Sequence, residues 1–296
     1  MIKQIINRIE NTYNDIKKYW HRNTKHENTH PQIKERIDKK ILATSIIRGS
    51  TIENSLVYFP LEGIRRLQLS VKKVTFKKCI FSHQIIENFM FQDCQFINCI
   101  FNGARIADVE FHQCFFSECA FYKTKFTSTY LDPTSLQFSW KWHWNWANIN
   151  AGLFQTLYRN SKDMHQEEFA MHADKKFQFY RRYDYLRGQN RQPNKFLRGL
   201  LFDYLLGYGY GIKNSLYVTA GLILGYSYLI DGTFKEKELS ILQSVYFSVV
   251  SFTTVGYGDM TPKYDIIPMA ITITFLLISV AWCAVVTAII VKRIVK

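Results

Sequence analysis

The sequence predicts a multidomain membrane protein in which an all-β solenoid precedes an α-helical membrane domain. Three observations lead to this prediction. Bulky apolar residues recur at every fifth position from Phe76 to Leu131. Near the C-terminus, Ile266–Val291 contains no charged residue and exceeds the ~20 residues that a spanning helix needs. Just before it, Thr253–Asp259 reads Thr-Thr-Val-Gly-Tyr-Gly-Asp.

The five-residue register defines the N-terminal half. A period of five fits neither an amphipathic helix nor a plain strand, and self-similarity at a fixed period indicates a repeat architecture. The run resembles the pentapeptide-repeat family, whose members form a four-sided right-handed β-helix with the central residue and the residue two places earlier facing inward. We therefore expect an all-β, quadrilateral β-helix over residues 41–135, with about three to four coils. The central residues are Phe76, Phe81, Ile86, Phe91, Phe96, Phe101, Ile106, Phe111, Phe116, Phe121, Phe126 and Leu131.

The inward position two places before each central residue is small or medium in size, apart from Gln84 and Phe89. Cysteines occupy it repeatedly, and four sides of five residues would stack them one coil apart, at ~4.8 Å. Their spacing does not suit a metal site, and a reducing cytoplasm disfavours disulfides, so we expect small buried hydrophobes. The predicted columns are Cys79 with Cys99 and Cys119, and Cys94 with Cys114.

Residues 1–40 are expected to form an amphipathic helix and a cap. Apolar residues from Ile2 to Trp20 fall at helical spacing among basic ones. Such a helix could lie on a membrane surface or contact another subunit. It could equally cover the open end of the β-helix, where unpaired strand edges need protection. A weaker repeat from Ser45 to Val57 predicts a first coil, and Tyr58–Ser70 interrupts the register.

Residues 136–204 are expected to form a tryptophan-rich cap and a charged helical linker. In Trp140–Trp146, tryptophans alternate with other residues, which predicts an extended segment with one aromatic face. This segment could cap the last coil, or it could contact a subunit or the membrane. The pattern is helical from Leu153 to Gly188, and Phe196–Leu206 is amphipathic.

The heptapeptide has the residue types needed to coordinate a dehydrated cation. A ring of backbone carbonyls from four copies of Thr-Val-Gly-Tyr-Gly can replace the water shell of a potassium ion. Gly256 and Gly258 can enter backbone regions closed to other residues and aim successive carbonyls along one axis. Thr254 adds a hydroxyl oxygen, while Val255 and Tyr257 point away. The stretch resembles the selectivity filter of potassium channels.

A re-entrant helix is predicted before the filter. Leu239–Thr253 is apolar and of helix length, but it is too short to cross a bilayer. We expect a pore helix over about 240–253 and the filter at 254–258. The negative end of the pore helix dipole would favour a cation there.

Two spanning helices are predicted around this hairpin. The first is Ile212–Ile230, with three tyrosines placed as interfacial anchors. The second is Ile266–Val291, which is long enough to tilt. The order of span, re-entrant helix, filter and span resembles the two-transmembrane potassium channels over residues 205–296. The three tyrosines are Tyr217, Tyr226 and Tyr228.

The resemblance implies passive, potassium-selective conduction by a homotetramer, because one filter strand cannot enclose an ion. Non-selective relatives carry Asp where Tyr257 stands, so this residue implies potassium over sodium. No enzymatic activity, no cofactor and no metal ion other than the permeant potassium is expected. The resemblance assigns the oxygens of the ion sites to Thr254, Val255, Gly256 and Tyr257, and the outer mouth to Gly258 and Asp259.

The pore segment departs from its family in two places, at Val250 and Ile278. Val250 stands where a well-studied bacterial relative has a glutamate that binds the filter Asp, so we expect inactivation to differ. Ile278 stands where many relatives have a hinge glycine. Trp282 aligns with a cavity-lining aromatic, which could gate the pore by dewetting or could pack against lipid or the first span. The candidate gate and cavity residues are Ile278, Trp282 and Val286.

Basic residues predict the orientation. Lys292 and Arg293 follow the second span, and a basic segment precedes the first. The positive-inside rule then places both termini in the cytoplasm, at a plasma membrane of the bacterial inner-membrane type. Anionic headgroups are expected to attract the residues near Arg181–Arg198. No signal peptide is visible.

A net charge of +14 raises the question of nucleic acid. The surplus lies largely in the N-terminal arm and the pre-membrane linker, where a bilayer is the simpler acidic partner, so we exclude nucleic acid. No arginine-rich span and no strand-linked Gly-x-Gly-x-x-Gly occurs, so neither a voltage sensor nor a dinucleotide-binding regulatory domain is expected. The alternative function is an interaction scaffold, in which β-helical rods present a binding face and the pore domain is a tetrameric anchor.

Overall fold

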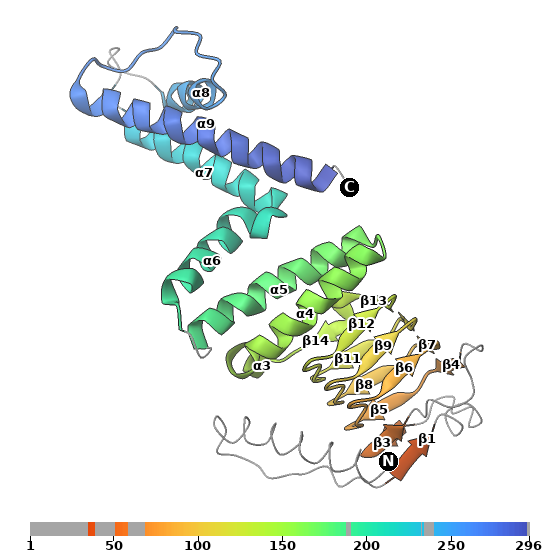
Figure 1. Cartoon of the computed structure of the whole chain (residues 1–296). Helices are drawn as coiled ribbons and strands as arrows, with labels where there is room; N and C mark the ends of the chain where they lie inside the picture. Colours follow the sequence, from red (N-terminus) through yellow and green to blue (C-terminus); the bar gives the residue numbers. More distant parts are fainter. Residues whose placement is uncertain are drawn as a thin grey trace. The chain divides into compact units, whose positions relative to one another are not determined.

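The computed structural model describes residues 35–38, 51–58, 69–187, 191–231, 233 and 240–294 (Figure 1). The chain divides into two compact units, Met1–Leu197 and Arg198–Lys296. The predicted amphipathic helix from Ile2 to Trp20 lies outside the described residues, as does most of the weaker repeat before Thr51.

The first unit contains a parallel β-solenoid of about four turns. Three of its sides are stacks of five, four and three strands, and the fourth is a ladder of single bridges that joins Leu56, Ile80, Ile100 and Ala120. The strands are β1 (Glu35–Asp38), β2 (Thr51–Glu53), β3 (Ser55–Tyr58), β4 (Leu69–Lys72), β5 (Thr75–Lys77), β6 (Ile85–Glu87), β7 (Phe89–Gln92), β8 (Gln95–Ile97), β9 (Arg105–Ala107), β10 (Glu110–His112), β11 (Phe115–Ser117), β12 (Lys125–Thr127), β13 (Tyr130–Leu131) and β14 (Leu136–Gln137).

The strand register confirms the coil length predicted from the five-residue period. Thr75 pairs with Gln95, which is 95 − 75 = 20 residues later. Thr51 pairs with Thr75, which is 75 − 51 = 24 residues later, so the predicted interruption after Tyr58 adds four residues to one coil. Strand β1 pairs with β3 and therefore brings stacked strands into the segment that was expected to form the cap.

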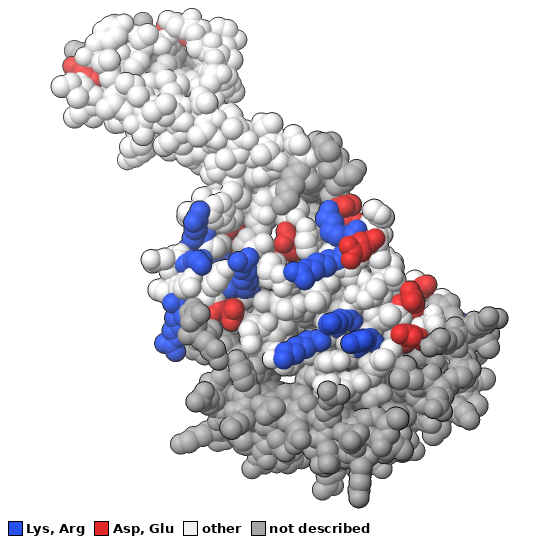
Figure 2. Space-filling view, viewed as in Figure 1, with Lys and Arg blue, Asp and Glu red and all other residues white. Residues whose placement is uncertain are grey.

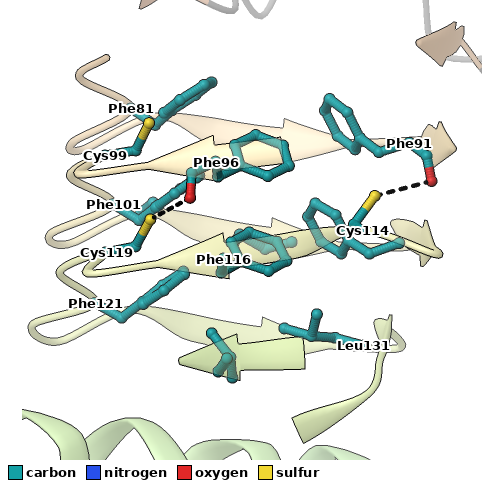
Figure 3. Close-up of a cluster of buried hydrophobic side chains, with 14 of the residues drawn as sticks. Phe81, Phe91, Phe96, Cys99, Phe101, Cys114, Phe116, Cys119, Phe121 and Leu131 are labelled. Carbon is teal, nitrogen blue, oxygen red and sulfur yellow. Dashed lines mark hydrogen bonds between the residues drawn. The ribbon is translucent and has the colours of Figure 1, made fainter. Parts of the chain in front are cut away.

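Phenylalanine columns fill the solenoid (Figure 3). Phe96 stacks between Phe76 and Phe116, with ring centroids 4.9 and 4.6 Å away and interplanar angles of 8° and 6°. Rings on adjacent sides meet edge to face, as do Phe96 and Phe101 at 5.8 Å. Aromatic pairs in these arrangements contribute about 0.5–1.5 kcal/mol each beyond their burial. The core is thus periodic, as the sequence predicted.

The corners of the solenoid have a regular feature that we did not predict from the sequence. One residue in five adopts a positive φ, which side chains other than glycine, asparagine and aspartate adopt at a cost. The turn therefore comes from the coil geometry and is not confined to residues that favour it. These corner residues are Asn54, Lys73, Lys78, His83, Asn88, Asp93, Asn98, Gly103, Asp108, Gln113, Glu118, Lys123 and Ser128.

The cysteine columns are confirmed, and the thiols are free. Cys119 donates its thiol to the carbonyl of Phe96 at 3.2 Å (Figure 3). Cys99 donates in the same way to the carbonyl of Phe76 at 3.3 Å. Thr124 uses the same inward position to donate to Phe101 at 2.8 Å. Burial raises the pKa of Cys99 well above its ordinary value, so the thiol stays a protonated donor. Among the described side chains, no group of three potential ligands is placed to hold a metal ion.

Helix α4 (Ala147–Asp163) covers the C-terminal end of the solenoid. The Asn160 side chain accepts a hydrogen bond from the Thr129 amide at 3.0 Å and donates to the Thr129 carbonyl at 2.7 Å. These bonds satisfy backbone groups at the last coil, which an open solenoid end would leave unpaired. Phe154 and Leu157 extend the apolar core into the helix.

The prediction of an extended tryptophan segment is wrong. Trp140–Asn145 forms the short helix α3. Trp140 and Trp144 pack edge to face with centroids 5.5 Å apart, and Trp142 and Trp146 do so at 4.6 Å. Residues four apart share one side of a helix, so the alternating pattern places its tryptophans on two sides of α3.

Glu118, at a solenoid corner, anchors this helix. Its carboxylate accepts hydrogen bonds from the amide and hydroxyl of Ser139 and from Nε1 of Trp142. Trp142 is buried, which supports the predicted cap role for this side chain, whereas Trp140 is exposed.

Helix α5 (Glu167–Arg187) packs along α4 (Figure 1). The helical pattern predicted from Leu153 is therefore divided by a turn, at which His165 has a φ of 56°. Arg182 is buried, and its guanidinium lies over the rings of Phe179, Tyr183 and Phe196 at 5.3, 5.4 and 6.0 Å. Cation–π contacts of this kind stabilise the packing. The prediction that basic residues here meet lipid headgroups is therefore wrong for Arg182.

Helix α6 (Pro193–Leu206) leads into the second unit, which contains η2 (Gly207–Gly209), α7 (Ile212–Ile230), α8 (Ile241–Phe252) and α9 (Ile266–Ile294). Helix α8 contacts both α7 and α9. The visible face of this unit carries few charged side chains, in contrast to the described part of the first unit (Figure 2).

Candidate functional site

Helix α8 leads into the heptapeptide through its C-terminal end. It begins with a capping box, in which Gln243 Oε1 accepts a hydrogen bond from the Ser240 amide at 2.8 Å. At the other end, the Thr253 amide donates to the Val249 carbonyl at 2.9 Å. The negative end of the helix dipole therefore lies beside the start of the predicted filter.

The backbone of residues 254–258 alternates in handedness. Thr254, Gly256 and Gly258 have φ values of 60°, 58° and 76°, whereas Val255 and Tyr257 between them are not in the left-handed region. In an extended strand, successive residues face opposite sides. Alternating left- and right-handed residues instead turn successive peptide groups the same way, as in backbone nests. The carbonyls of this segment can therefore share one side.

Thr254 carries backbone strain. It is β-branched, and a left-handed conformation costs such a residue about 1–2 kcal/mol. Strain of this kind is concentrated at functional sites, where the surrounding structure enforces it. The amides that follow the helix are held in place, since Thr254 donates to the Ser251 carbonyl at 3.2 Å and Val255 donates to Val250 at 3.1 Å.

Tyr246 holds the residue at the predicted outer mouth. Its hydroxyl donates a hydrogen bond to Asp259 Oδ2 at 3.1 Å. From the sequence, only Val250 was expected to lie beside this carboxylate, and Tyr246 was not predicted. Tyr246 and Val250 lie one turn apart on α8, and residues four apart share a helix face. The same spacing argument could therefore have found Tyr246.

Tyr226 joins α7 to α9. It is buried, its ring stacks on Phe275 with centroids 3.7 Å apart, and its hydroxyl donates to Thr272 Oγ1 at 3.0 Å. The expectation that Tyr226 is an interfacial anchor is therefore wrong. Tyr217 and Tyr228 are exposed, and their role as interfacial anchors stays a prediction.

Trp282 makes the second polar contact between these helices. Its indole Nε1 donates to Thr219 Oγ1 on α7 at 2.8 Å, and the side chain is half-buried. Of the two interpretations left open for Trp282, this contact supports packing against the first helix. Ile278 is exposed and Val286 is half-buried, and a gate at these positions stays a prediction.

A sequence profile described as ion channel matches residues 215–296. This segment is an ion channel domain. The matched segment includes the heptapeptide, α8, α9 and most of α7. Membership of the ion channel family implies a pore and permeant ions, and it does not imply an enzymatic activity. Among the described residues one helix, Ile266–Val291, is long and apolar enough to cross a membrane. The ion channel domain is therefore part of a membrane protein, and the spanning role of α7 stays a prediction.

A solved structure of QnrB1, a plasmid-mediated fluoroquinolone resistance protein, is similar over 33% of this chain and 70% of its own chain. The identity is 13% and the TM-score is 0.14. No curated protein matches the chain. The description of the first unit as a solenoid rests on the strand register given above.

Proposed function

We propose that this protein is a potassium-selective channel, in which four copies of residues 254–258 surround one axis and conduct potassium passively. The alternating handedness of these residues is the observation that carries the proposal. It allows successive carbonyls to face one axis, and Gly256 and Gly258 adopt positive φ without the penalty that other residues incur. A ring of such carbonyls replaces the hydration shell of the ion.

Assembly as a homotetramer is part of the proposal. Val255 and Tyr257 are 52% and 70% exposed in a single chain. Large apolar side chains exposed beside a functional backbone mark a surface that another molecule covers. Neighbouring copies around a closed four-fold axis would bury both side chains and complete the ring of carbonyls.

Within this assembly, Thr254, Val255, Gly256 and Tyr257 would provide the oxygens of the ion sites. Gly258 and Asp259 would shape the outer mouth, where Tyr246 holds the carboxylate. Tyr257 would favour potassium over sodium, as its likeness to the filters of potassium channels implies.

The bilayer would be the second partner. We infer that α7 and α9 span a plasma membrane of the bacterial inner-membrane type, with both termini in the cytoplasm. On α6, Leu197, Leu201 and Tyr204 are exposed at helical spacing, and Lys195 and Arg198 are exposed beside them. This pattern is typical of a helix that lies in the interface of an anionic membrane.

Potassium flux from liposomes that contain the purified protein tests the proposal. We expect barium-sensitive potassium flux that exceeds sodium flux. Gly256→Ala should abolish it, because a left-handed alanine costs about 1–2 kcal/mol per chain, or roughly 4–8 kcal/mol over four chains. Gly221→Ala is the matched control, since Gly221 has no positive φ and a Cβ added there meets nothing within 4 Å.

Selectivity gives a second test. Tyr257→Asp should reduce the preference for potassium over sodium while flux persists. The proposal would be wrong if neither the full wild-type chain nor a chain starting near Phe196 carried potassium flux. The scaffold alternative would then be favoured. If the full chain and the shortened chain conduct with equal open probability, the solenoid assembles or supports the channel and does not gate it.

A further inference from the structure

His143 lies where α3 packs against α5. Its ring centroid is 5.0 Å from that of Phe179, 5.4 Å from Tyr180 and 5.9 Å from Tyr183. The first two contacts are edge to face, with interplanar angles of 83° and 66°. The imidazole of this six-residue helix is thus half-enclosed by three aromatic rings of α5.

The charged groups around His143 favour its neutral form. On α5, Lys176 is close enough to repel an imidazolium. On the solenoid, Glu118 attracts it, but this carboxylate already accepts hydrogen bonds from Ser139 and Trp142. On α3 itself, Lys141 is exposed and adds only a positive charge.

The other helix in contact with α3 adds no charge nearby. Helix α4 starts at Ala147, and its first charged residue is Arg159, 159 − 147 = 12 residues later. At ~1.5 Å per residue this places Arg159 about 18 Å along the helix. Tyr180 and Tyr183 also face the ring from α5, and burial raises the pKa of Tyr180 above its ordinary value. The Arg182 guanidinium lies over the rings of Phe179 and Tyr183 and adds a further positive charge on this side.

The electrostatic consequence has a definite sign. Burial lowers the pKa of His143 below its ordinary value of 6.5, and Lys176 lowers it further, against a smaller opposite effect of Glu118. The folded state therefore binds this proton less well than the unfolded state does. The part of the stability that depends on neutral His143 is fully present above pH 6.5 and is lost as the pH falls through the lowered pKa.

We propose that His143 is an acid-sensitive joint, whose protonation releases α3 from the aromatic face of α5. The joint is connected to the end of the linker. Tyr183 contacts His143 on one side and, with a centroid distance of 6.0 Å, Phe196 at the start of α6 on the other. Release of α3 would also break the contact between Trp144 and Tyr183, whose centroids are 5.5 Å apart. This inference does not depend on the proposed potassium conduction.

Tryptophan fluorescence of the full chain in lipid nanodiscs tests the joint, because four of the six tryptophans of the chain lie at 140–146. As the pH is lowered from about 7.5 to about 5, we expect emission to move to longer wavelength, with a midpoint below 6.5. His143→Phe keeps a ring in the aromatic cluster and removes the proton site, so the shift should vanish. His172→Gln, at a partly exposed position of α5 beside Glu168, is the matched control and should behave as wild type.

Lys176→Met separates a proton switch from a purely structural role. Removal of the repelling charge should move the midpoint to higher pH, an effect that packing alone would not produce. The proposal is overturned if the wild-type chain shows no shift in this range, if His143→Phe retains it, or if Lys176→Met leaves the midpoint unchanged. The Lys176 result keeps the test decisive should His143→Phe fail to fold.

Discussion

The solenoid and the ion channel domain bury their apolar residues in opposite ways. In the solenoid, the central phenylalanines are almost fully buried within one chain, and Phe96, for example, stacks on rings one coil away on both sides. In the channel domain, the shared core is small, comprising Tyr226, Ile230, Phe252 and Phe275 with partly buried neighbours. Most of its large apolar side chains stay exposed.

This difference follows from what covers each surface. The apolar residues of the solenoid find their partners inside the chain, so their burial removes them from water without a second molecule. A membrane domain has lipid around it and, in our proposal, three other copies, so apolar exposure in one chain carries no penalty. A single chain is therefore a complete folding unit in the first case and one part of an assembly in the second.

The largest effect is expected in the solenoid core. Phe116 is 1% exposed and stacks on Phe96 at 4.6 Å, so Phe116→Ala should lower the free energy of unfolding of the solenoid by about 3–5 kcal/mol. Denaturant unfolding of the full chain measures it.

The preceding residue provides the control. Phe115 lies on the same strand but faces outward and is 37% exposed. Phe115→Ala should change the free energy of unfolding by only about 0.5 kcal/mol. Equal losses for the two variants would contradict a core that is completed within one chain.

Much of the solenoid was predictable because its sequence period equals its structural period. The 20-residue register and the cysteine columns follow directly from the positions of residues such as Cys99 and Cys119. The tryptophan segment was mispredicted because residues at every second position also include residues four apart, which share one face of a helix. Trp140 and Trp144 satisfy a helix as well as a strand, and the anchor at Glu118, 24 residues before Trp142, decides between them.

The channel site was predictable in its backbone and less so in its side-chain partners. The glycines at 256 and 258 indicate positive φ by themselves. The contacts of Tyr246 with Asp259 and of Thr219 with Trp282 join residues 13 and 63 positions apart. The first could have been inferred from helical spacing on α8 together with the resemblance that places Val250 beside Asp259, whereas the second requires tertiary structure to be known.

A smaller effect is expected where the solenoid ends. Asn160→Ala removes two hydrogen bonds to Thr129 and leaves its buried backbone groups unpaired, which should cost about 1–3 kcal/mol of unfolding free energy. Asn148→Ala, at an exposed position of the same helix, is the control for the change in helix propensity. If the two variants lose the same stability, the end of the solenoid does not depend on Asn160.

The smallest effect is expected between α7 and α9. Trp282→Phe and Thr219→Val each remove one partner of the 2.8 Å hydrogen bond, and their double-mutant cycle should give a coupling of about 0.6 kcal/mol, at most ~1.7 kcal/mol, as for other bonds between membrane helices. The thermal stability of the protein in nanodiscs gives this coupling. Because Trp282 is turned towards α7, Trp282→Phe should leave single-channel conductance unchanged. A changed conductance without any coupling would instead place the indole in the ion pathway, and the channel domain would then have a gate that no contact within a single chain reveals.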